Sequence, residues 1–357
     1  MRELSIQFSQ EAFKWHVYQK CPMKLSKLYY EIQMPHSLLN TDDTAIDLSI
    51  ITVTYQSENH IENCISSVIA STITDRYEHI IVDNGSVDGT VAIVEEYSRY
   101  VQFIKNKENL GFAGANNQAI KRAKGRYILY LNPDMQIISG YLDDLITLMD
   151  QNAQIGAASC KLVDANRKSL NSLRPSKIPS LRAFVLHFFL RLPVGSYWKS
   201  NVLYPQFQDD QEQSVELVRG AFLMTKKEIV QKLGYAFDPR FFILFEDIDL
   251  CKNISQMGYK IQYFPKIHCI DFFSQSFIQR HWMWYYKNLS ISFVRFASKW
   301  YSNIHLLWII PSLLAGFFVR IIYWIRGLRT QKILSYYQSN TLMQYIIKNY
   351  GQYTQRD

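Results

Sequence analysis

The run LSIITVTY at residues 48–55 decides the fold when it is read with its successors, ENHIENCISSVIAS at 58–71 and EHIIVD at 78–83. The first and third runs are largely apolar and rich in β-branched residues, which is typical of strands buried on both faces. In the second run, apolar residues recur at helical spacing from Ile61 to Ile69. This order of strand, helix and strand predicts a parallel βαβ unit.

The same alternation continues along the chain. We predict strands at VQFIK (101–105) and YILYLN (127–132), a helix from about Val91, and a helix over GFAGANNQAIKRAKG (111–125) that Gly125 closes. Farther on, the patterns predict a helix at 141–155, strands at 155–164 and over VELVRGAFLMTK (215–226), helices at 227–234 and 246–258, and a strand at 259–265. This order is typical of an α/β fold with a mostly parallel sheet and helices on both faces.

These patterns divide the chain into three parts. Residues 1–45 are weakly patterned and are expected to form an N-terminal accessory arm. Residues 46–275 carry the α/β pattern, and 276–357 form a basic, aromatic, helical C-terminal extension. Within the α/β part, we interpret 165–214 as a long variable segment that contributes to an acceptor site.

The net charge of +8 is unevenly distributed. From Phe272 to Asp357 there are ten Lys and Arg residues and one acid, so the rest of the chain is close to neutral. A basic segment suits either nucleic acid or anionic lipid, but the tryptophans and long apolar runs of this one favour lipid. We therefore expect an anionic membrane surface as a partner and no nucleic acid.

The cysteines are odd in number, and their spacing matches no metal site; they are Cys21, Cys64, Cys160, Cys251 and Cys269. We expect buried, reduced thiols of a cytosolic protein. The first residues, MRELSIQFSQEAFKWHV, lack the apolar core of a secretory signal. The functional part is therefore expected in the cytoplasm.

Polar and small residues follow the first strands of the predicted sheet. In an open parallel sheet, ligands bind at the carboxyl ends of the strands. Asp83 is thus a candidate acceptor for the N3–H of a uracil or thymine ring, with Tyr55 covering the ring face; alternatively, Asp83 only caps the following turn. The small residues of NLGFAGANN (109–117) let backbone amides approach a ribose or diphosphate, although close helix–sheet packing explains them equally well.

Asp134 follows the strand that ends in Leu131-Asn132-Pro133. A carboxylate at a strand end suits a divalent cation that bridges the two phosphates of a sugar nucleotide. The alternative is a turn, because Asn-Pro-Asp is strong turn chemistry. His268 is a candidate to complete this metal site or to contact the diphosphate, and the alternative is a structural histidine.

Three carboxylates, Glu246, Asp247 and Asp249, follow the apolar run FFILF. Acids at a helix start ordinarily complement the helix dipole. A carboxylate beside apolar walls also suits a general base that deprotonates a sugar hydroxyl. We select Asp247 as this base, with Glu246 beside it, and assign Asp249 a structural role.

Taken in order, the motifs VTYQSENHIENCISSV, IIVDNGSVDGT, NLGFAGANNQAI, YLNPDM, GAFLMTKKEI and FFILFEDIDLCKNISQMGYKIQYFP resemble glycosyltransferase family 2. The resemblance is strongest to its bacterial rhamnosyltransferase-like branch and runs from about Asp47 to His268. It implies a GT-A fold, an inverting mechanism and a divalent cation, Mg²⁺ or Mn²⁺. It also implies that Tyr55 and Asp83 hold the nucleotide base, Asp134 is the metal-binding acid of an Asp-x-Asp motif, Asp247 is the base, and His268 lies near the metal.

The predicted site combines these roles. Its members are Asp247 and Glu246 as catalytic residues; Thr54, Tyr55, Glu58, Asp83, Gly111, Asn116 and Asn132 as nucleotide-sugar-binding residues; and Asp134 and His268 as metal ligands. One position departs from the family pattern, because Asn132 replaces the first acid of Asp-x-Asp. This replacement removes a charge near the metal and leaves the strictness of metal dependence open.

The predicted activity is a sugar transfer in the synthesis of bacterial cell-surface polysaccharide. The resemblance favours dTDP-rhamnose as the donor and a glycan on a polyprenyl diphosphate as the acceptor. The rivals are a UDP-hexose donor, a nucleotidyltransferase, and a non-catalytic membrane scaffold that retains the fold. A nucleotidyltransferase would usually carry a Gly- and Lys-rich phosphate loop at the first strand, and SIITVTYQSEN has neither residue.

Residues 301–319 form a stretch of 19 residues without Lys, Arg, Asp or Glu. This is close to the ~20 residues that a membrane-spanning helix needs. Pro311 weakens that interpretation, whereas Trp308 and Arg320 suit a helix lying in the interface. We expect peripheral association with the cytoplasmic face of the membrane, with a single span as the alternative. The non-membrane alternative is a helical pair packed on the α/β part or on a second subunit of a homodimer.

Overall fold

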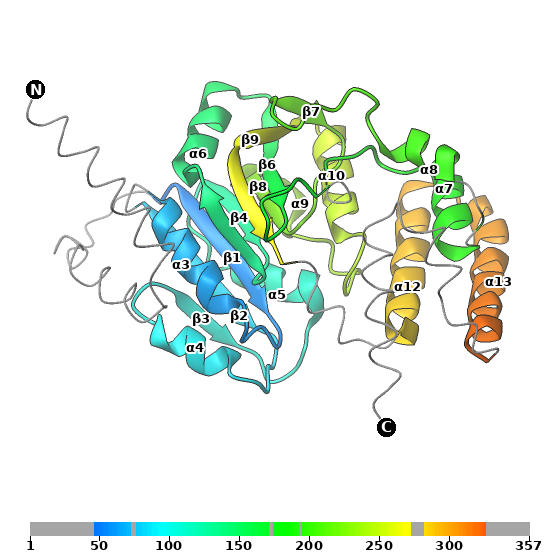
Figure 1. Ribbon diagram of the computed structural model, residues 1–357, viewed down its shortest axis with the longest axis horizontal. Helices are drawn as coiled ribbons and strands as arrows, with labels where there is room; N and C mark the ends of the chain where they lie inside the picture. The colour runs from blue at the N-terminus through cyan, green and yellow to red at the C-terminus, as the bar shows by residue number, and fades with distance from the viewer. Residues whose placement is uncertain are drawn as a thin grey trace, which may run out of the picture. The chain divides into compact units, whose positions relative to one another are not determined.

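The computed structural model describes residues 46–72, 76–170, 174–190, 192, 195–272 and 282–325. The accessory arm predicted at 1–45 lies outside the described residues. Within them, the expected α/β architecture is present, because a nine-stranded sheet carries helices on both faces (Figure 1).

The sheet has a parallel half and a mixed half. The parallel half has the order β3-β2-β1-β4, and its strands are β1 (Leu48–Thr54), β2 (Tyr77–Asp83), β3 (Gln102–Lys105) and β4 (Tyr127–Leu131). The other strands are β5 (Met135–Ser139), β6 (Ile155–Val163), β7 (Gln213–Val215), β8 (Phe222–Lys226) and β9 (Lys260–Asp271). Strand β8 runs antiparallel to both β4 and β6, β9 runs parallel to β6, and β5 and β7 run antiparallel to β9. The βαβ pattern of the sequence thus accounts for the first half of the sheet.

Strand β1 is buried along its whole length because helices cover both faces of the sheet. Leu48 and Ile50 pack in one core with helices α3, α4 and α6, whereas Ile51 and Val53 pack in the other with α5, α9 and α10. These helices are α3 (Ile61–Ser71), α4 (Thr90–Glu96), α5 (Gly111–Ile120), α6 (Leu142–Gln151), α9 (Lys227–Leu233) and α10 (Glu246–Gln256). The alternation of side chains along one strand therefore builds two cores from one apolar run.

The single strand predicted over 215–226 is wrong. The segment divides into β7, which pairs with β9, and β8, which pairs with β4 and β6. Leu217 and Val218 lie in the connection and are buried. A buried connection and a buried strand give the same apolar pattern, so periodicity alone could not separate them.

Two further boundaries differ from the prediction. Helix α5 ends at Ile120, and Gly125 is not its cap: a Cβ at Gly125 would lie 2.4 Å from the Ser49 nitrogen, so this glycine allows close packing on β1. Strand β9 continues past Pro265 to Asp271. The pairing of β9 with β6 shifts register close to this proline, which leaves room for a residue that cannot donate to the ladder.

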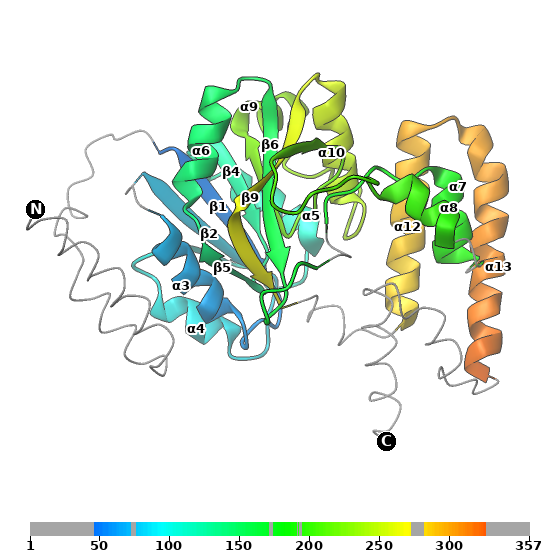
Figure 2. The same cartoon turned by 45° about the horizontal axis from the view of Figure 1, so that its top comes forward.

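The described part of the C-terminal extension forms two long helices, α12 (Trp282–Trp300) and α13 (Leu306–Ile325), joined through a short 3₁₀ turn, η3 (Asn303–His305). They lie side by side, next to α7 (Leu181–Phe184), the π-helical turn η2 (Val185–Phe189) and α8 (Gly195–Val202) (Figure 2). Helix α13 approaches η2 so closely that a Cβ at Gly316 would lie 2.4 Å from the Phe189 carbonyl oxygen. The variable segment 165–214 and the extension therefore meet.

Helix α13 has one packed face and one exposed face. Ile309 and Leu313 are buried, whereas the opposite face exposes large apolar side chains, namely Ile304 on η3 and Leu307, Ile310, Leu314 and Phe318 on α13. Among the described residues, Asn303–Arg320 is the window long and apolar enough to cross a membrane, with a mean hydropathy of 1.4 and 11% of it buried. Length and composition alone are weak support for a span.

Candidate active site

The carboxyl ends of β1 and β2 meet at Thr54 and Asp83, which are paired in the sheet. The Thr54 hydroxyl donates to Asp83 Oδ1 at 2.9 Å, and the amides of Gly85 and Ser86 donate to Oδ2 at 3.1 and 2.9 Å. Asp83 is 1% exposed. Its carboxylate therefore orders the turn after β2, which is the structural role that the sequence also allowed.

The loop after β1 carries two other predicted residues. Tyr55 is half-buried, and the following Gln56 has a left-handed φ of 53°. Glu58 is exposed, and its Oε2 accepts a hydrogen bond from the Gly89 amide at 2.8 Å, at the start of α4. The hydroxyl oxygen of Ser86 accepts a hydrogen bond from the Gln56 amide at 2.8 Å. The loops after β1 and β2 thus hold each other at the strand ends.

Gly111 joins these strand ends to the loop before the carboxylate cluster. Its φ is +78°, and a Cβ there would lie 2.4 Å from the Phe242 carbonyl oxygen. The next amide, that of Phe112, donates to that same oxygen at 2.8 Å. The Asn84 side chain, beside Asp83, donates to the Gly111 carbonyl at 3.1 Å. The structure therefore brings the second, third and sixth of the sequence motifs into one hydrogen-bonded chain.

Two asparagines of α5 serve the framework. Asn116 is 1% exposed and donates to the Phe112 carbonyl at 2.9 Å, so it faces its own helix. Asn117 accepts from the Ala236 and Phe237 amides at 2.8 and 3.1 Å and donates to the Phe237 carbonyl at 2.7 Å. Asn116 was predicted from the sequence and Asn117 was not, because helical spacing does not reveal which asparagine meets a distant loop.

Asp134 lies in the turn between β4 and β5 and is 7% exposed. Asn132, at the same turn, is anchored by its amide, which donates to the Ala221 carbonyl at 2.9 Å. The negative charge of Asp134 adds to burial in raising the pKa of the neighbouring Cys64 thiol to about 12. Cys64, Cys160, Cys251 and Cys269 are all buried and free, as expected for reduced thiols; Cys21 lies outside the described residues.

The expected pairing of Asp134 with His268 is not formed. On β9, His268 lies opposite Ser139, whereas the Phe272 amide donates to the Asp134 carbonyl at 3.1 Å. Four residues of extended strand separate His268 from Phe272, roughly 13 Å. Burial lowers the pKa of His268, and the positive charge of Lys161 lowers it further. The charge that acts most strongly on His268 is thus that of Lys161 rather than that of Asp134.

The residue that β9 does bring to the Asp134 turn is Asp271, which pairs with Met135 and is 8% exposed. Among the described residues, no group of three His, Cys, Asp or Glu side chains forms a metal-binding cluster. Even so, two carboxylates at one turn are hard oxygen donors of the kind that Mg²⁺ and Mn²⁺ take, so the donor chemistry fits such an ion. An acid at the end of an apolar strand was the signal in the sequence that could have identified Asp271.

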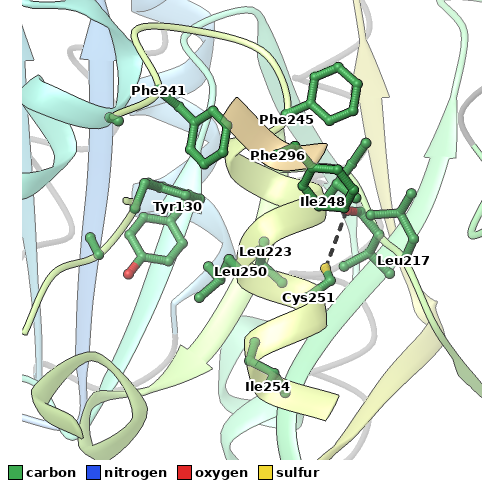
Figure 3. Close-up of a cluster of buried hydrophobic side chains, with 14 of the residues drawn as sticks. Tyr130, Leu217, Leu223, Phe241, Phe245, Ile248, Leu250, Cys251, Ile254 and Phe296 are labelled. Carbon is green, nitrogen blue, oxygen red and sulfur yellow. Dashed lines mark hydrogen bonds between the residues drawn. The ribbon is translucent and has the colours of Figure 1, made fainter. Parts of the chain in front are cut away.

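Helix α10, which carries the three carboxylates, is held in place by apolar packing. Ile248, Cys251 and Ile254 project from one side of α10 into a cluster with Leu217 and Phe296 (Figure 3). Two non-glycine residues in left-handed conformation, Leu244 (φ 70°) and Phe245 (φ 71°), precede the helix. Such conformations cost of order 1–3 kcal/mol each and cluster at functional sites.

Within the described part of the chain, the Asp247 carboxylate accepts hydrogen bonds from backbone amides alone. Its Oδ1 accepts from Ile248 at 2.8 Å and its Oδ2 from Gly220 at 3.3 Å. Asp249 is 0% exposed and accepts from Lys299 Nζ and Trp300 Nε1, both at 2.7 Å. The structural role predicted for Asp249 is thus confirmed, because it ties α10 to α12.

Glu246 is buried, and none of the described residues gives its Oε2 a hydrogen-bond partner. Burial, together with the negative charges of Asp247 and Asp249, raises the pKa of Glu246 from 4.5 to about 8. Glu246 is therefore largely protonated near neutral pH.

Replacing Glu246 by Gln is expected to flatten the pH dependence of stability. The folded protein holds the Glu246 proton more tightly than the unfolded chain, so the free energy of unfolding falls as pH rises from about 4.5 to about 8. In thermal unfolding from about pH 5 to pH 9, the stability of the variant relative to that of the wild type should therefore increase as pH rises. Replacing the exposed Glu108 by Gln is the control and should give no such trend. A constant offset between wild type and Glu246→Gln across this range would contradict the raised pKa.

Comparisons with known proteins agree with this architecture. The family model described as glycosyl transferase family 2 matches residues 49–234. The N-acetylglucosaminyl-diphospho-decaprenol L-rhamnosyltransferase of Mycobacterium tuberculosis is 27% identical, over 61% of this chain and 73% of the relative. The rhamnosyltransferase WbbL of Escherichia coli K12 is also 27% identical, over 67% of this chain and 89% of the relative.

A solved structure, the mannosyltransferase PcManGT of Pyrobaculum calidifontis in complex with GDP-Man and Mn²⁺, matches with a TM-score of 0.47 and 18% identity, covering 92% of this chain and 94% of that one. The family model covers more than half of the 357 residues, from β1 to the end of α9. The chain therefore belongs to glycosyl transferase family 2 and is a glycosyltransferase with a GT-A fold.

Proposed function

We propose that the protein transfers L-rhamnose from dTDP-rhamnose, with inversion, to a glycan carried on a polyprenyl diphosphate during bacterial cell-surface polysaccharide synthesis. The observation that carries this proposal is that the loop leading into α10, and so to Asp247, is bonded to the strand ends. The Phe242 carbonyl of this loop accepts from the Phe112 amide, and the Gly111 carbonyl accepts from Asn84, beside Asp83. This bonding connects a candidate base with a candidate nucleotide site. Two rhamnosyltransferases among the relatives support the choice of sugar, and the decaprenol in one name supports a lipid-linked acceptor.

In the proposed reaction, Asp247 takes the proton of an acceptor hydroxyl as its oxygen attacks the anomeric carbon of the donor sugar. The bond from that carbon to the diphosphate breaks, and the nucleoside diphosphate leaves with the electron pair. A single displacement inverts the anomeric configuration. The two backbone amides on Asp247 fix the direction of its carboxylate, so that the base is positioned before the acceptor binds.

The nucleotide is proposed to lie across the ends of β1 and β2, against Thr54, Tyr55 and Asp83. Glu58, Gly111, Asn116 and Asn132 complete the proposed binding set, the buried Asn116 acting by shaping α5 rather than by contact. Asp134, with Asp271 in place of His268, is proposed to hold Mg²⁺ or Mn²⁺. Such an ion would offset the negative charge of the leaving diphosphate.

We propose the division of the chain into a catalytic domain at 46–275 and a membrane-associating extension at 276–357. The exposed apolar face of α13 supports contact with lipid, and the packed face supports an interfacial helix over a solitary span, because lipid does not surround it on all sides. This arrangement would hold the catalytic domain at the cytoplasmic face of the membrane, where a lipid-linked acceptor is available.

The proposed function is tested with a donor panel of dTDP-rhamnose, UDP-glucose, UDP-galactose and UDP-N-acetylglucosamine, each with and without Mn²⁺. Binding and acceptor-independent hydrolysis are measured on the full chain in detergent. We expect a metal-assisted preference for dTDP-rhamnose. A preference for a UDP sugar would replace the donor assignment, and the absence of binding to all four would favour the non-catalytic scaffold.

In the same assay, Asp134→Asn is expected to lower metal-assisted hydrolysis by about a hundredfold or more, since a metal contributes several kcal/mol to stabilising the leaving charge. A variant with the metal response of the wild type would remove Asp134 from the metal site.

A further inference from the structure

Arg219 is a cation beside the candidate base with no partner in the described structure. It immediately precedes Gly220, whose amide donates to Asp247. The side chain is half-buried, and no ion pair or side-chain hydrogen bond among the described residues involves it. A guanidinium that is partly withdrawn from water and lacks a counter-ion is costly, so an anion bound there would relieve an existing penalty.

The surroundings of Arg219 extend from the base to the C-terminal helices. Burial raises the pKa of the Cys251 thiol on α10. The charge of Asp247 adds to this rise, and the charge of Arg219 opposes it. Burial also raises the pKa of Tyr285 on α12, and the charges of Arg219 and Arg320 partly offset that rise. The charge of Arg219 therefore acts on a residue of α10 and on a residue of α12, and the charge of Arg320 acts on the same residue of α12.

Arg320 is fixed in place on α13. Its guanidinium donates to the carbonyl oxygens of Phe189 at 2.9 Å and Phe188 at 2.5 Å, and it stacks on the Tyr286 ring, 4.3 Å from the centroid. The charges of two cations, one of them held by hydrogen bonds to backbone carbonyls, thus act on Tyr285.

Beyond this point, the outer face of α13 is apolar, from Leu307 to Phe318. Arg219 adjoins the residue whose amide binds the candidate base, and Arg320 lies on the helix that carries the apolar face. A lipid-linked sugar carries a matching set of groups: a hydroxyl, a diphosphate attached to that sugar, and a hydrocarbon chain. Because the diphosphate follows the first sugar directly, it must bind about one sugar ring away from the base.

We propose that Arg219 binds the diphosphate of a lipid-linked acceptor and so sets which acceptors reach Asp247. This inference rests on the proposed function, because it assigns a part of the acceptor to a residue near the same base. Arg219 would select for an anionic link between sugar and lipid, whereas the apolar face of α13 would receive the hydrocarbon without reading its chemistry.

The test compares two acceptors with the full chain in detergent: N-acetylglucosamine on a short polyprenyl diphosphate, and the same sugar as its uncharged octyl glycoside. For Arg219→Gln, we expect the KM for the diphosphate acceptor to rise by about 10- to 100-fold, the typical effect of losing a charge-assisted hydrogen bond. The KM for the donor and the transfer to the octyl glycoside should not change. Arg219→Lys should recover part of the loss, and Arg182→Gln, at an exposed arginine of α7, is the matched control.

Three outcomes would overturn the inference. An equal loss with both acceptors would give Arg219 a structural role, and a raised donor KM would assign it to the donor diphosphate. Weaker binding of Arg219→Gln to vesicles with phosphatidylglycerol, but not to neutral vesicles, together with unchanged acceptor KM, would identify bulk lipid headgroups as the anion. Failure of the proposed function is distinguishable from these, because the wild type itself would then transfer sugar to neither acceptor.

Discussion

Replacing Asp247 by Asn lowers the turnover for sugar transfer by about 10³- to 10⁴-fold, the upper range for loss of a general base. Asparagine keeps the shape of the side chain, and its oxygen can still accept from the amide of Ile248 or Gly220. The loop before α10 should therefore stay in place. What is lost is the ability to take a proton from the acceptor hydroxyl, so donor affinity should remain close to that of the wild type.

The measurement is single-turnover transfer with saturating donor, alongside donor binding by calorimetry. Asp144→Asn is the matched control, because it makes the same chemical change at an exposed carboxylate in the first turn of α6. If Asp247→Asn retained a tenth or more of wild-type turnover, the base would have to be sought elsewhere. A large loss of donor binding would instead indicate that Asp247 contacts the donor.

Replacing Lys299 by Met is expected to lower the free energy of unfolding by about 3–5 kcal/mol, because it leaves the buried Asp249 without its counter-ion and removes one of the two cations that pair with Asp238. Lys299 Nζ lies 2.7 Å from Asp249 and 2.8 Å from Asp238, which are 1% and 3% exposed, respectively. Burial raises the pKa of Asp249, and Lys299 is the main charge that opposes the rise. For Asp238, burial is outweighed by hydrogen bonds from Arg240 and Lys299, which hold its pKa well below the usual range.

Urea denaturation of the full chain in a mild detergent measures this effect. Lys105→Met is the control, because Lys105 pairs with Glu95 on the surface, where the side chains are 51% and 52% exposed; its loss should cost at most about 1 kcal/mol. Adding Asp249→Asn to Lys299→Met should restore part of the stability by removing the unpaired charge. Equal effects of the two lysine substitutions would mean that the cluster around Asp249 does not fasten α12 to α10.

This cluster also explains why the extension is expected to influence catalysis. Asp249 is two residues from Asp247 on the same short helix, and its partners Lys299 and Trp300 end α12. The position of the candidate base is therefore tied to the helices proposed to meet the membrane. The two single substitutions separate the roles: Asp247→Asn should remove turnover with little effect on stability, and Lys299→Met should lower stability first.

Much of the fold could be predicted because its patterns are local. The apolar run at 48–55 and its successors identified the parallel half of the sheet, and the glycines after α9 and α10 marked two helix ends through their left-handed conformations, at Gly234 and Gly258. The order of the motifs predicted the family, which the match over 49–234 confirms. Burial of the four described cysteines also agreed with the prediction.

What the sequence alone determined is thus the class of fold, the family and the segments that carry the candidate site. Only the tertiary structure decided that β9 brings Asp271 rather than His268 to the Asp134 turn, that 215–226 divides between two places in the sheet, and that Asp249 meets α12. The physical reason is that periodicity reports whether a residue is buried, a property of its own segment. Which side chain it meets depends on the register and pairing of segments far apart in the chain, and no local pattern encodes that pairing.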